Sequence, residues 1–478
     1  MYKKLLSETV IYGLGSILPR LIYFALNPLF TSKISPSEFS KFGELYALVA
    51  FVNVVLTMGF ETAYFRYSAD KNITHRVFHT TFWYVFINAI SFLLLVYLLK
   101  IPIAHFFDYH ENPEYILFFA WMAFFDAICM VPFAYLRFTN QPVKYTAIKI
   151  GQNLFQVGLV LAFFFLIPKG FLDKVGMTEN VSYPFVANVI GSFFGVLLLF
   201  PIIKKVRWFF DFKLFKKMFN YGYPVMIAGL AFVTNENLDK ILLKGMIDKS
   251  EAGAYNGCYK IATIMILLVT AYRLGVEPFF FKKAMDEDAK KSYADVMLYF
   301  VMICGFGLVA LLGNLDWIKK IIIPNPDYWV AIQIVPVVVI ANFFFGIYYN
   351  LSTWYKVTDK TWVGTVVSWI GAGVTILFNV IFIPIIGFMA SAWATMAAYG
   401  LMMIISYFWG QSSYRIPYKT RKILLYMLLS IGFGVLAFKL SKDSFIIGNL
   451  FVIAYIGIVY LIERSSMKLM KNQEIRNE

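Results

Sequence analysis

Arg20 is the residue whose position most strongly suggests chemistry, because it lies near the middle of a long apolar run close to the N-terminus. A charge at the centre of a membrane-spanning helix costs about 2.5–3.5 kcal/mol on insertion scales, so it needs a functional or structural reason. Small and polar residues recur at steps of three and four along this run: Gly13, Ser16, Arg20, Tyr23 and Asn27. The stripe predicts a helix face that lines a wet cavity, and Pro19 can kink this helix.

The guanidinium of Arg20 suits an anionic ligand, and a diphosphate in particular, because its planar fork of donors matches phosphate oxygens. We therefore predict that Arg20 binds an anionic headgroup. The alternative is a structural ion pair with a buried carboxylate such as Asp126, which lies in another apolar run. Both arrangements can occur in different states of one protein, and the sequence leaves them open.

A second polar stripe follows in the next apolar run and contributes Asn53 to the predicted binding surface, together with Asn27 of the first. Its members recur at helical spacing: Tyr46, Ala50, Asn53, Thr57, Glu61 and Tyr64. We expect this face to line the same cavity as Arg20. Arg66 lies at the end of the run, where it either contacts phosphate or anchors the helix end at the membrane surface.

Two further cations are predicted to support anion binding, Lys260 and Arg273, which share one apolar run. Glu277 follows Arg273 by four residues. That spacing allows either a local ion pair or a gate for phosphate at the cytoplasmic side.

Carboxylates inside apolar runs are the candidates for coupling transport to protons or sodium ions. The stretch NENLDK from Asn235 supplies Glu236 and Asp239, and the earlier runs supply Asp126 and Glu61. Mutual neutralisation is the alternative, because Glu236 and Lys240 have the i, i+4 spacing of a helical ion pair.

The elements that position these residues are membrane-spanning helices. Hydrophobic residues make up 60% of the 478 residues and charged residues only 15%, which departs from soluble domains in the membrane direction. A spanning helix needs about 20 mostly apolar residues, and on that basis we place about fourteen helices. They lie near 7–30, 38–65, 77–99, 114–137, 145–167, 182–203, 219–243, 251–276, 293–313, 328–354, 361–384, 387–410, 422–440 and 444–463.

The positive charges orient these helices. The net charge is +15, and most of the 43 lysine and arginine residues fall at the termini and in the even-numbered loops. Because cytoplasmic loops carry the excess of positive charge, we expect both termini to be cytoplasmic. The basic residues are not clustered outside these membrane-flanking loops, so nucleic acid is not an expected partner.

An internal repeat divides the chain. ISPSEFSKFGELYA from Ile34 aligns with IDKSEAGAYNGCYK from Ile247, and both follow the first helix of a six-helix block. Both copies start on the same side of the membrane, so the repeat is parallel, with its axis along the membrane normal. We expect an N-terminal lobe at 1–212, a C-terminal lobe at 213–411, and two additional helices and a tail at 412–478.

Three segments in order resemble one family: SKISPSEFSKFGELYA followed by MGFETAYFR, then NYGYPVMIAG followed by LDKILLKGMIDKSEAGAYNGCYKIA, and FNVIFIPIIGFMASAWATMAAYG. They resemble the Wzx-type polysaccharide flippases of the multidrug/oligosaccharidyl-lipid/polysaccharide exporter superfamily. The resemblance implies two six-helix lobes around a central cavity with alternating access. It also implies a substrate that is an oligosaccharide linked to undecaprenyl diphosphate, moved from the cytoplasmic to the periplasmic leaflet of the bacterial inner membrane.

The expected function is therefore transport for surface polysaccharide synthesis, of the O-antigen or capsule type, and not enzymatic catalysis. The expected partners are the lipid-linked anionic glycan, membrane lipid, other polysaccharide assembly proteins and a coupling cation. The competing hypotheses are a lipid II flippase, an ion-coupled drug antiporter, and a membrane polysaccharide polymerase or ligase. A single arginine in the first helix favours a polysaccharide repeat over lipid II, and cationic cavity residues disfavour cationic drugs.

Other motifs predict no cofactor and no metal. The acidic triplet Asp286–Asp288 lies among lysines in a short loop, and His75 and His79 alone do not make a zinc site. No GxxxxGK[ST] motif occurs, so the chain has no P-loop of its own. The three cysteines share no metal-like spacing and indicate no disulfide framework.

Overall fold

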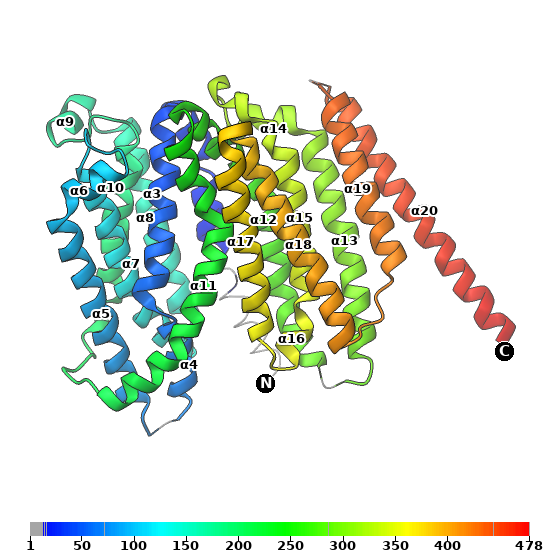
Figure 1. The fold of residues 1–478 in the computed structure, drawn as a ribbon, viewed down its shortest axis with the longest axis horizontal. Coiled ribbons are helices and arrows are strands. Elements are labelled where there is room, and N and C mark those ends of the chain that lie inside the picture. The colour runs from blue at the N-terminus through cyan, green and yellow to red at the C-terminus, as the bar shows by residue number, and fades with distance from the viewer. Residues whose placement is uncertain are drawn as a thin grey trace. The chain divides into compact units, whose positions relative to one another are not determined.

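The structure is a computed structural model that describes residues 13, 15, 17–70, 72–284, 286–442 and 444–477, with side chains except at 278, 281, 282 and 465–477. Residues 17–24 are helical and precede the first labelled helix. In the first part of the chain the helices are α2 (Asn27–Lys33), α3 (Pro36–Thr57), α4 (Phe60–Ser68), α5 (Thr74–Leu98), α6 (Lys100–Phe106), α7 (Glu114–Phe138), α8 (Pro142–Phe165), α9 (Lys169–Lys174), α10 (Ser182–Ile203) and α11 (Phe212–Met246) (Figure 1).

The second part of the chain is helical in the same way. Its helices are α12 (Lys249–Lys283), α13 (Ala289–Gly313), α14 (Leu315–Ile322), the 3-10 helix η1 (Pro326–Ala331), α15 (Ile334–Leu351), α16 (Thr353–Val357), α17 (Trp362–Ile386), α18 (Met389–Ser413), α19 (Thr420–Leu440) and α20 (Phe445–Asn477). The described ranges contain no strand, which confirms the predicted all-α class.

Twelve helical segments of the described chain are long and apolar enough to cross a membrane, and each coincides with a predicted span. The two remaining predictions have separate explanations. The span near 7–30 lies partly outside the described residues, and the span near 219–243 falls within α11, whose polar stretch NENLDK lowers its hydropathy. A multi-pass membrane protein is therefore confirmed.

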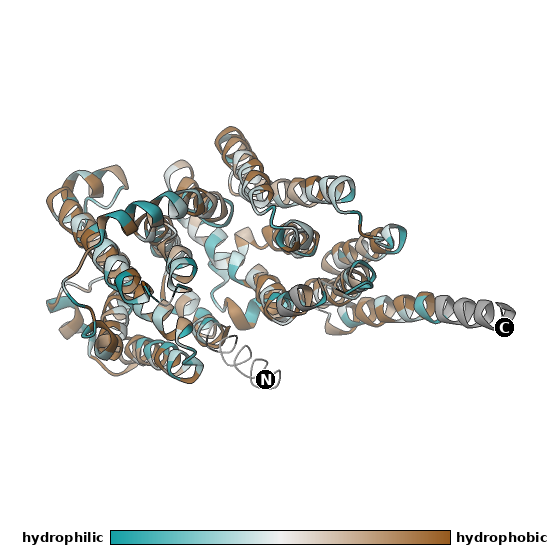
Figure 2. Ribbon diagram, turned by 90° about the horizontal axis from the view of Figure 1, so that it is seen from below, coloured by the Kyte–Doolittle hydropathy of each residue, from teal (hydrophilic) through white to brown (hydrophobic). Residues whose placement is uncertain are grey.

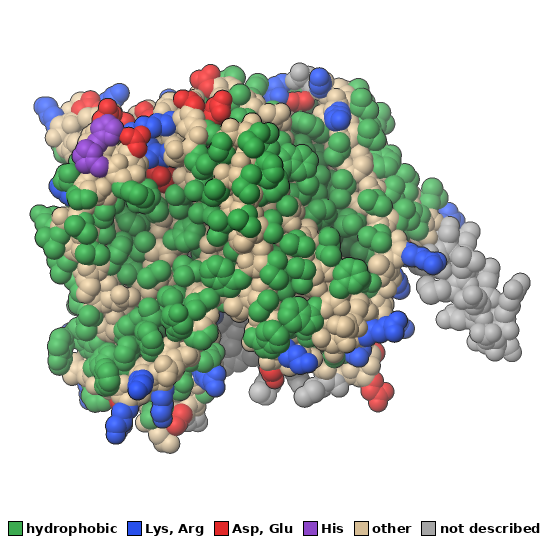
Figure 3. Space-filling model, viewed as in Figure 1, with side chains coloured by type: hydrophobic (Ala, Val, Ile, Leu, Met, Phe, Trp, Pro, Cys, Tyr) green, Lys and Arg blue, Asp and Glu red, His purple; other side chains and the backbone are tan. Residues whose placement is uncertain are grey.

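The chain packs as two compact units. Unit 1 comprises residues 1–256 with Asn379–Gly387, and unit 2 comprises Gly257–Phe378 with residues 388–478. The helices of each unit are seen end-on in Figure 2, where hydrophobic residues occupy much of their surfaces. In Figure 3 hydrophobic side chains cover the middle of each unit, and charged side chains gather towards the helix ends. The lobes expected at 1–212 and 213–411 stay a prediction.

Unit 1 is built around α7, α3 and α11. Helix α7 packs against α10, α5 and α3, and α3 packs against α11. Helices α3 and α4 are separated by Met58 and Gly59, which both have left-handed backbone (φ 44° and 68°). A methyl group on Gly59 would lie 2.5 Å from the carbonyl oxygen of Gly222, so glycine is needed both for the turn and for the contact with α11.

Unit 2 has α15 at its centre. Helix α15 packs against α18 and α13, and α13 packs against α19 and α20. Most of α15 is buried inside the protein, whereas α19 and α20 expose large apolar side chains such as Leu428 and Ile453. This is the burial expected of a central helix and of peripheral helices that face lipid. The three cysteines of the chain are free and buried.

Candidate functional site

A buried ion pair joins α3 and α11 at one end of unit 1. The Nζ atom of Lys244 lies 2.6 Å from Oε2 of Glu44, and the two side chains are only 2% and 4% exposed. The hydroxyl of Tyr109 donates to the same Glu44 oxygen (2.7 Å), and Lys244 also donates to the carbonyl of Phe107 (2.7 Å). The Lys244 ammonium lies 3.8 Å from the centre of the Tyr109 ring. A buried charge pair is tolerated when its remaining hydrogen bonds are satisfied, as they are here.

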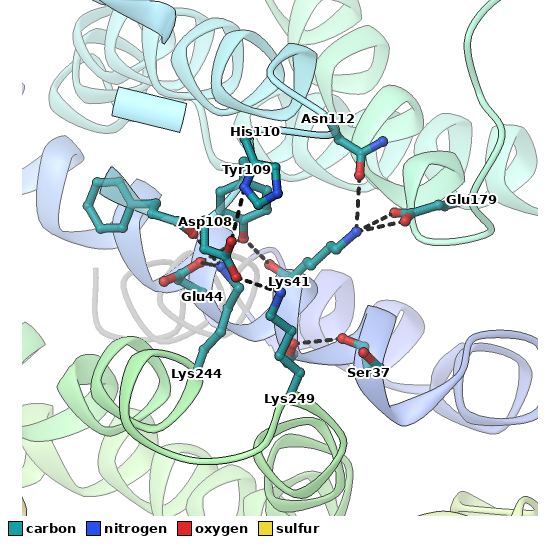
Figure 4. Close-up of polar contacts among 12 residues, drawn as sticks. Ser37, Lys41, Glu44, Asp108, Tyr109, His110, Asn112, Glu179, Lys244 and Lys249 are labelled. Carbon is teal, nitrogen blue, oxygen red and sulfur yellow. Dashed lines mark hydrogen bonds and ion pairs between the residues drawn. The ribbon is translucent and has the colours of Figure 1, made fainter. Parts of the chain in front are cut away.

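A second ion pair lies beside the first and is more exposed. Lys249, at the start of α12, lies 2.5 Å from Asp108, which also contacts the Nδ1 atom of His110 (3.1 Å). The hydrogen bond from Lys249 holds the pKa of Asp108 below its ordinary value. Figure 4 shows Lys244 and Lys249 both reaching towards the segment around Asp108, between α6 and α7.

A third ion pair connects α3 to the segment before α10. Lys41 lies 2.7 Å from Glu179 and also donates to Asn112 (3.1 Å). Tyr115 donates to Glu179 as well (2.8 Å). We use the name charged cluster for the members of the three pairs: Lys41, Glu44, Asp108, Glu179, Lys244 and Lys249. The cluster ties α3, the α6–α7 connection, the segment before α10 and the α11–α12 turn together at one end of unit 1.

Close backbone contact accompanies the charged cluster. A methyl group on Gly253 of α12 would lie 1.6 Å from the carbonyl oxygen of Pro36 and 3.0 Å from the nitrogen of Ser40. A methyl group on Gly43 would lie 2.1 Å from Nδ2 of Asn256. In the alignment that pairs Ile34 with Ile247, Ser40 pairs with Gly253 and Gly43 with Asn256. Paired positions of the predicted repeat thus lie in contact, and the repeat itself stays a prediction.

A chain of hydrogen bonds crosses unit 1 within its membrane spans. The hydroxyl of Tyr23 lies 3.1 Å from that of Tyr46, and Tyr46 accepts from Asn188 (2.7 Å). Ser192, one turn after Asn188, donates to Asp126 (2.8 Å). Four helical segments thus place hydroxyl, amide and carboxyl groups in one continuous polar path that ends at Asp126.

Of the predicted binding residues Arg20, Asn27 and Asn53, the described contacts place Asn53 on this path. Asn53 lies near the carboxyl of Asp126, and Asn27 is buried at the start of α2. The Arg20 side chain is exposed, and within the described residues it makes no hydrogen bond or ion pair. The alternative of an Arg20–Asp126 ion pair is therefore not found in this part of the chain.

The first helix is interrupted shortly before α2. The chain leaves the helix at Ala25 and Leu26, and Pro28 follows in the first turn of α2. Pro19 lies inside the continuous helical stretch 17–24. The helix is interrupted before Pro28, which lacks the N–H that would continue it, and the kink at Pro19 stays a prediction.

Glu61 and Arg66 of α4 both have partners. Glu61 forms an ion pair with Arg137 of α7 (2.6 Å), with each side chain 44% exposed. Arg66 is exposed, and its guanidinium lies 4.5 Å from the centre of the Tyr221 ring. Because Glu61 is neutralised by a cation, it is a weaker coupling candidate than Asp126, and its coupling role stays a prediction.

The predicted coupling carboxylates of α11 lie in a dense polar group. Asp239 is buried, accepts from the hydroxyl of Tyr255 (2.6 Å) and forms an ion pair with Lys240 (3.2 Å). Lys240 also donates to the backbone carbonyl of Glu236 (2.6 Å). Lys240 therefore contacts both Asp239 and Glu236. At the predicted i, i+4 partner, Glu236, this hydrogen bond goes to the backbone carbonyl.

The cations of unit 2 gather around one aromatic ring. The guanidinium of Arg273 lies 5.5 Å from the centre of the Tyr349 ring, and the ammonium of Lys356 lies 3.9 Å from the same centre. Lys356 forms an ion pair with Glu277 (3.4 Å). Among the described residues the ion-pair partner of Glu277 is Lys356 of α16, and the expected local pair between Arg273 and Glu277 is not found. Lys260 is half-buried and lies nearer the start of α12.

Two cations around one ring and one carboxylate leave a net positive charge at this place, which suits an anionic ligand.

Sequence reasoning did not single out Glu44, Lys244, Asp108 or Lys356 as site residues. A signal existed for Glu44, which is a carboxylate inside a predicted span and within the repeat motif. Lys244 and Asp108 fall at the borders of predicted spans, where charges are ordinary. The pairing of Lys244 with Glu44 depends on how α11 packs on α3, and the pairing of Asp108 with Lys249 depends on how the α6–α7 connection meets the start of α12. Both are tertiary features.

The sequence is similar to known proteins over part of its length. A family described as "Polysaccharide biosynthesis protein" matches residues 5–283. An uncharacterised membrane protein of Methanocaldococcus jannaschii, MJ1068, is 26% identical over 317 residues, which cover 62% of this chain and 60% of that protein. The chain therefore spans about three fifths of the length of this curated relative.

Two solved structures share the fold of this chain. The lipid II flippase MurJ in an inward closed conformation superposes with a TM-score of 0.74 at 16% identity, over 94% of this chain and 99% of MurJ. An inward-facing multidrug resistance MATE transporter of the MOP superfamily superposes with a TM-score of 0.66 at 11% identity, over 84% and 97%. At these identities the likeness is one of fold.

Proposed function

This chain belongs to the polysaccharide biosynthesis protein family, and from that premise we propose that it moves a lipid-linked oligosaccharide across its membrane by alternating access. The family match over residues 5–283 is the observation that carries the proposal. The flippase and transporter folds of the structural neighbours support it, because the chain shares them over most of its length. The substrate is an oligosaccharide on undecaprenyl diphosphate for surface polysaccharide synthesis, and the site of action is the bacterial inner membrane.

The lysine and arginine side chains of the candidate site bind the diphosphate. In unit 2, Arg273 and Lys356 lie around the Tyr349 ring with Glu277 as their carboxylate neighbour. Glu277 orients Lys356 in the absence of substrate, and a diphosphate can replace it as the partner of this lysine. Because one carboxylate faces two cations, a positive charge remains to attract the diphosphate. Arg20, Arg66 and Lys260 supply further positive charge, and Asn27 and Asn53 supply hydrogen bonds for the sugars.

Closure of one side of the protein falls to the charged cluster. With both termini cytoplasmic, the cluster lies at the extracytoplasmic end of unit 1. Its buried pair, Glu44 with Lys244, holds the end of α11 against α3. Separating these helices exposes both charges to water, which lowers the cost of opening relative to an apolar contact of the same size.

Coupling to a cation, proton or sodium, falls to the polar path that ends at Asp126, with Glu236 and Asp239 of α11 as second candidates. Asp126 accepts a hydrogen bond from Ser192 and lies beside Asn53, and among the described residues it forms no ion pair. A carboxyl of this kind can change its charge without breaking an internal ion pair.

The test is transport by the purified chain in proteoliposomes that contain a fluorescent undecaprenyl-diphosphate oligosaccharide. Movement of the glycan to the other leaflet is expected, and it should fall at least tenfold in Arg20→Ala and in Arg273→Ala. Arg415→Ala is the control, because Arg415 is exposed in the loop between α18 and α19. Absence of movement by a folded wild-type protein would refute the proposal, as would full transport by both cavity variants.

A lipid II flippase is the second candidate, and the superposition with MurJ favours it. Rescue of cells depleted of their lipid II flippase separates the two substrates. Growth after expression of this chain would assign lipid II, whereas rescue of a surface-polysaccharide export defect alone would assign the oligosaccharide. Drug resistance without either rescue would indicate an antiporter, and glycan polymerisation by the purified protein would indicate an enzyme.

A further inference from the structure

A strongly basic surface of unit 1 is used by none of the groups described above. It lies between α10 and the first turns of α11, and we call residues 204–217 the basic segment. Six exposed cations occur in it: Lys204, Lys205, Arg207, Lys213, Lys216 and Lys217. The segment contains one acid, Asp211. Its charge is therefore strongly positive and faces outward.

Large aromatic side chains of the basic segment are exposed together with its cations. Trp208 is 85% exposed and Phe212 is 70% exposed, and Phe209 and Phe210 are exposed as well. Contiguous aromatic exposure of this kind is unfavourable in water. It is favourable at the boundary between lipid headgroups and acyl chains, where aromatic rings are enriched in membrane proteins.

The backbone of the basic segment is held in place by α5. The N–H of Arg207 donates to Nδ1 of His79 (3.2 Å), and the indole of Trp83 donates to the carbonyl of Arg207 (2.9 Å). The N–H of Asp211 donates to the hydroxyl of Thr80 (3.1 Å). Because three hydrogen bonds fix the main chain, the cations are presented from a defined platform and not from a loose loop.

Asp211, the one acidic residue of the basic segment, stabilises the start of α11. Asp211 accepts from the N–H of Leu214 (3.0 Å) and so caps the start of α11, and it lies 3.9 Å from Arg76 of α5. Within the part of the chain that the structure describes, none of the six cations forms an ion pair. Their charge is therefore available to an external partner.

The first turns of α11 are amphipathic. Leu214 and Met218 are buried, whereas Lys213, Lys216 and Lys217 are exposed. In Figure 1 these turns run across the lower end of unit 1 before the helix turns upward. A helix that lies across the ends of spanning helices, with its lysines outward and flanked by exposed aromatic rings, has the character of an interfacial anchor.

We propose that the basic segment binds the anionic phospholipid headgroups of the adjacent leaflet. The cations contact the phosphodiester groups, and Trp208 and Phe212 insert at the level of the glycerol backbone. The partner is lipid and not a soluble anion, because the exposed aromatic rings gain nothing from a ligand in water. This proposal is independent of which substrate the protein carries.

The test measures thermal unfolding of the full-length protein in a neutral detergent with increasing phosphatidylglycerol or phosphatidylcholine. The wild type should be stabilised by phosphatidylglycerol at lower concentration than by phosphatidylcholine, and the difference should shrink in high salt. The triple variant K213Q/K216Q/K217Q should need about tenfold to about a hundredfold more phosphatidylglycerol for the same stabilisation.

The matched control is K33Q/K169Q/K174Q, which removes three exposed lysines from the other end of unit 1 and should respond as the wild type does. Equal action of both lipids on the wild type would overturn the proposal, and so would a wild-type response of the triple variant. Loss of the phosphatidylglycerol effect on adding millimolar methylene diphosphate at constant ionic strength would instead assign a site for soluble diphosphate. If the triple variant does not fold, K204Q/K205Q carries the same expectation and the same refutation.

Discussion

Lys244→Met is the most informative single substitution, because it removes one partner of a fully buried ion pair. Methionine keeps the length of the side chain but leaves the Glu44 carboxyl, which is 4% exposed, with only the hydrogen bond from Tyr109. Breaking a buried pair in this way costs about 3–5 kcal/mol. The hydrogen bond to Phe107 is lost as well. The substitution should therefore be among the most destabilising of any single lysine in unit 1.

The expected shift in unfolding temperature follows from the size of the chain. An unfolding entropy of about 2.1 cal/mol/K for each of 478 residues gives about 1 kcal/mol/K for the whole chain. A loss of about 3–5 kcal/mol then lowers the unfolding temperature by about 3–5 °C when the chain unfolds as one. Scanning fluorimetry in detergent or nanodiscs measures this shift.

The double variant E44Q/K244M separates the lost pair from lost packing. Glutamine keeps an acceptor for Tyr109 and carries no charge, so the double variant should recover at least about 2 kcal/mol of the loss. Lys249→Met is the control, because Lys249 and Asp108 are 42% and 49% exposed and their pair is worth about 1 kcal/mol or less.

The Lys249–Asp108 pair, which the control variant removes, contributes to stability in a pH-dependent way. The pKa of Asp108 is lowered, so its small contribution is present above the ordinary aspartate pKa and is lost as the pH falls through the folded-state value.

An unfolding temperature of Lys244→Met equal to that of the wild type would refute the reasoning. Simple additivity in the double variant would refute it too.

Three further predictions concern other parts of the molecule. Gly253→Leu should lower the unfolding temperature by several degrees, because even a methyl group would lie 1.6 Å from the carbonyl oxygen of Pro36; Gly170→Leu, at a glycine with open space around it, is the control for scanning fluorimetry. Asp126→Asn should keep the fold within about 1 kcal/mol, because an amide oxygen still accepts from Ser192, but should abolish dependence of transport on an imposed ion gradient; unchanged gradient dependence in a flux assay would exclude Asp126 as the coupling group. Lys356→Gln should weaken substrate binding about tenfold, the loss of one charge-assisted hydrogen bond, whereas Lys356→Arg should restore most of it; equal affinities in a titration of both variants would remove Lys356 from the site.

The membrane spans could be predicted from sequence because each depends only on a local apolar run. Helix α11 shows where that rule is incomplete: Asn235, Glu236 and Asp239 lower its hydropathy, yet they belong to a continuous helix of 35 residues. The charges find partners inside the protein, among them Lys240 and Tyr255, and those partners come from packing that hydropathy does not describe.

The polar stripes show what a local pattern can predict. Helical periodicity alone fixes which residues share a face, and Tyr23 and Tyr46 of the two stripes do meet through their hydroxyls. The binding role of these stripes stays a prediction. The pairing of Glu44 with Lys244 could not be predicted, because it joins residues of two helices that are distant in sequence. The interruption at Ala25 and Leu26 was not predicted, because a local pattern with prolines at 19 and 28 does not decide where the chain leaves the helix.

The contact between α3 and the start of α12 bears on which substitutions these two segments can accept. In a homodimer with a true two-fold axis, a glycine on the axis must face its own copy. A substitution by a larger residue therefore introduces two larger side chains into the same contact. Here Gly43 faces Asn256, and Gly253 lies against the backbone of Pro36 and Ser40. At this contact one segment supplies the space and the other supplies the group that fills it. We therefore expect substitutions at these positions to be correlated between the two segments.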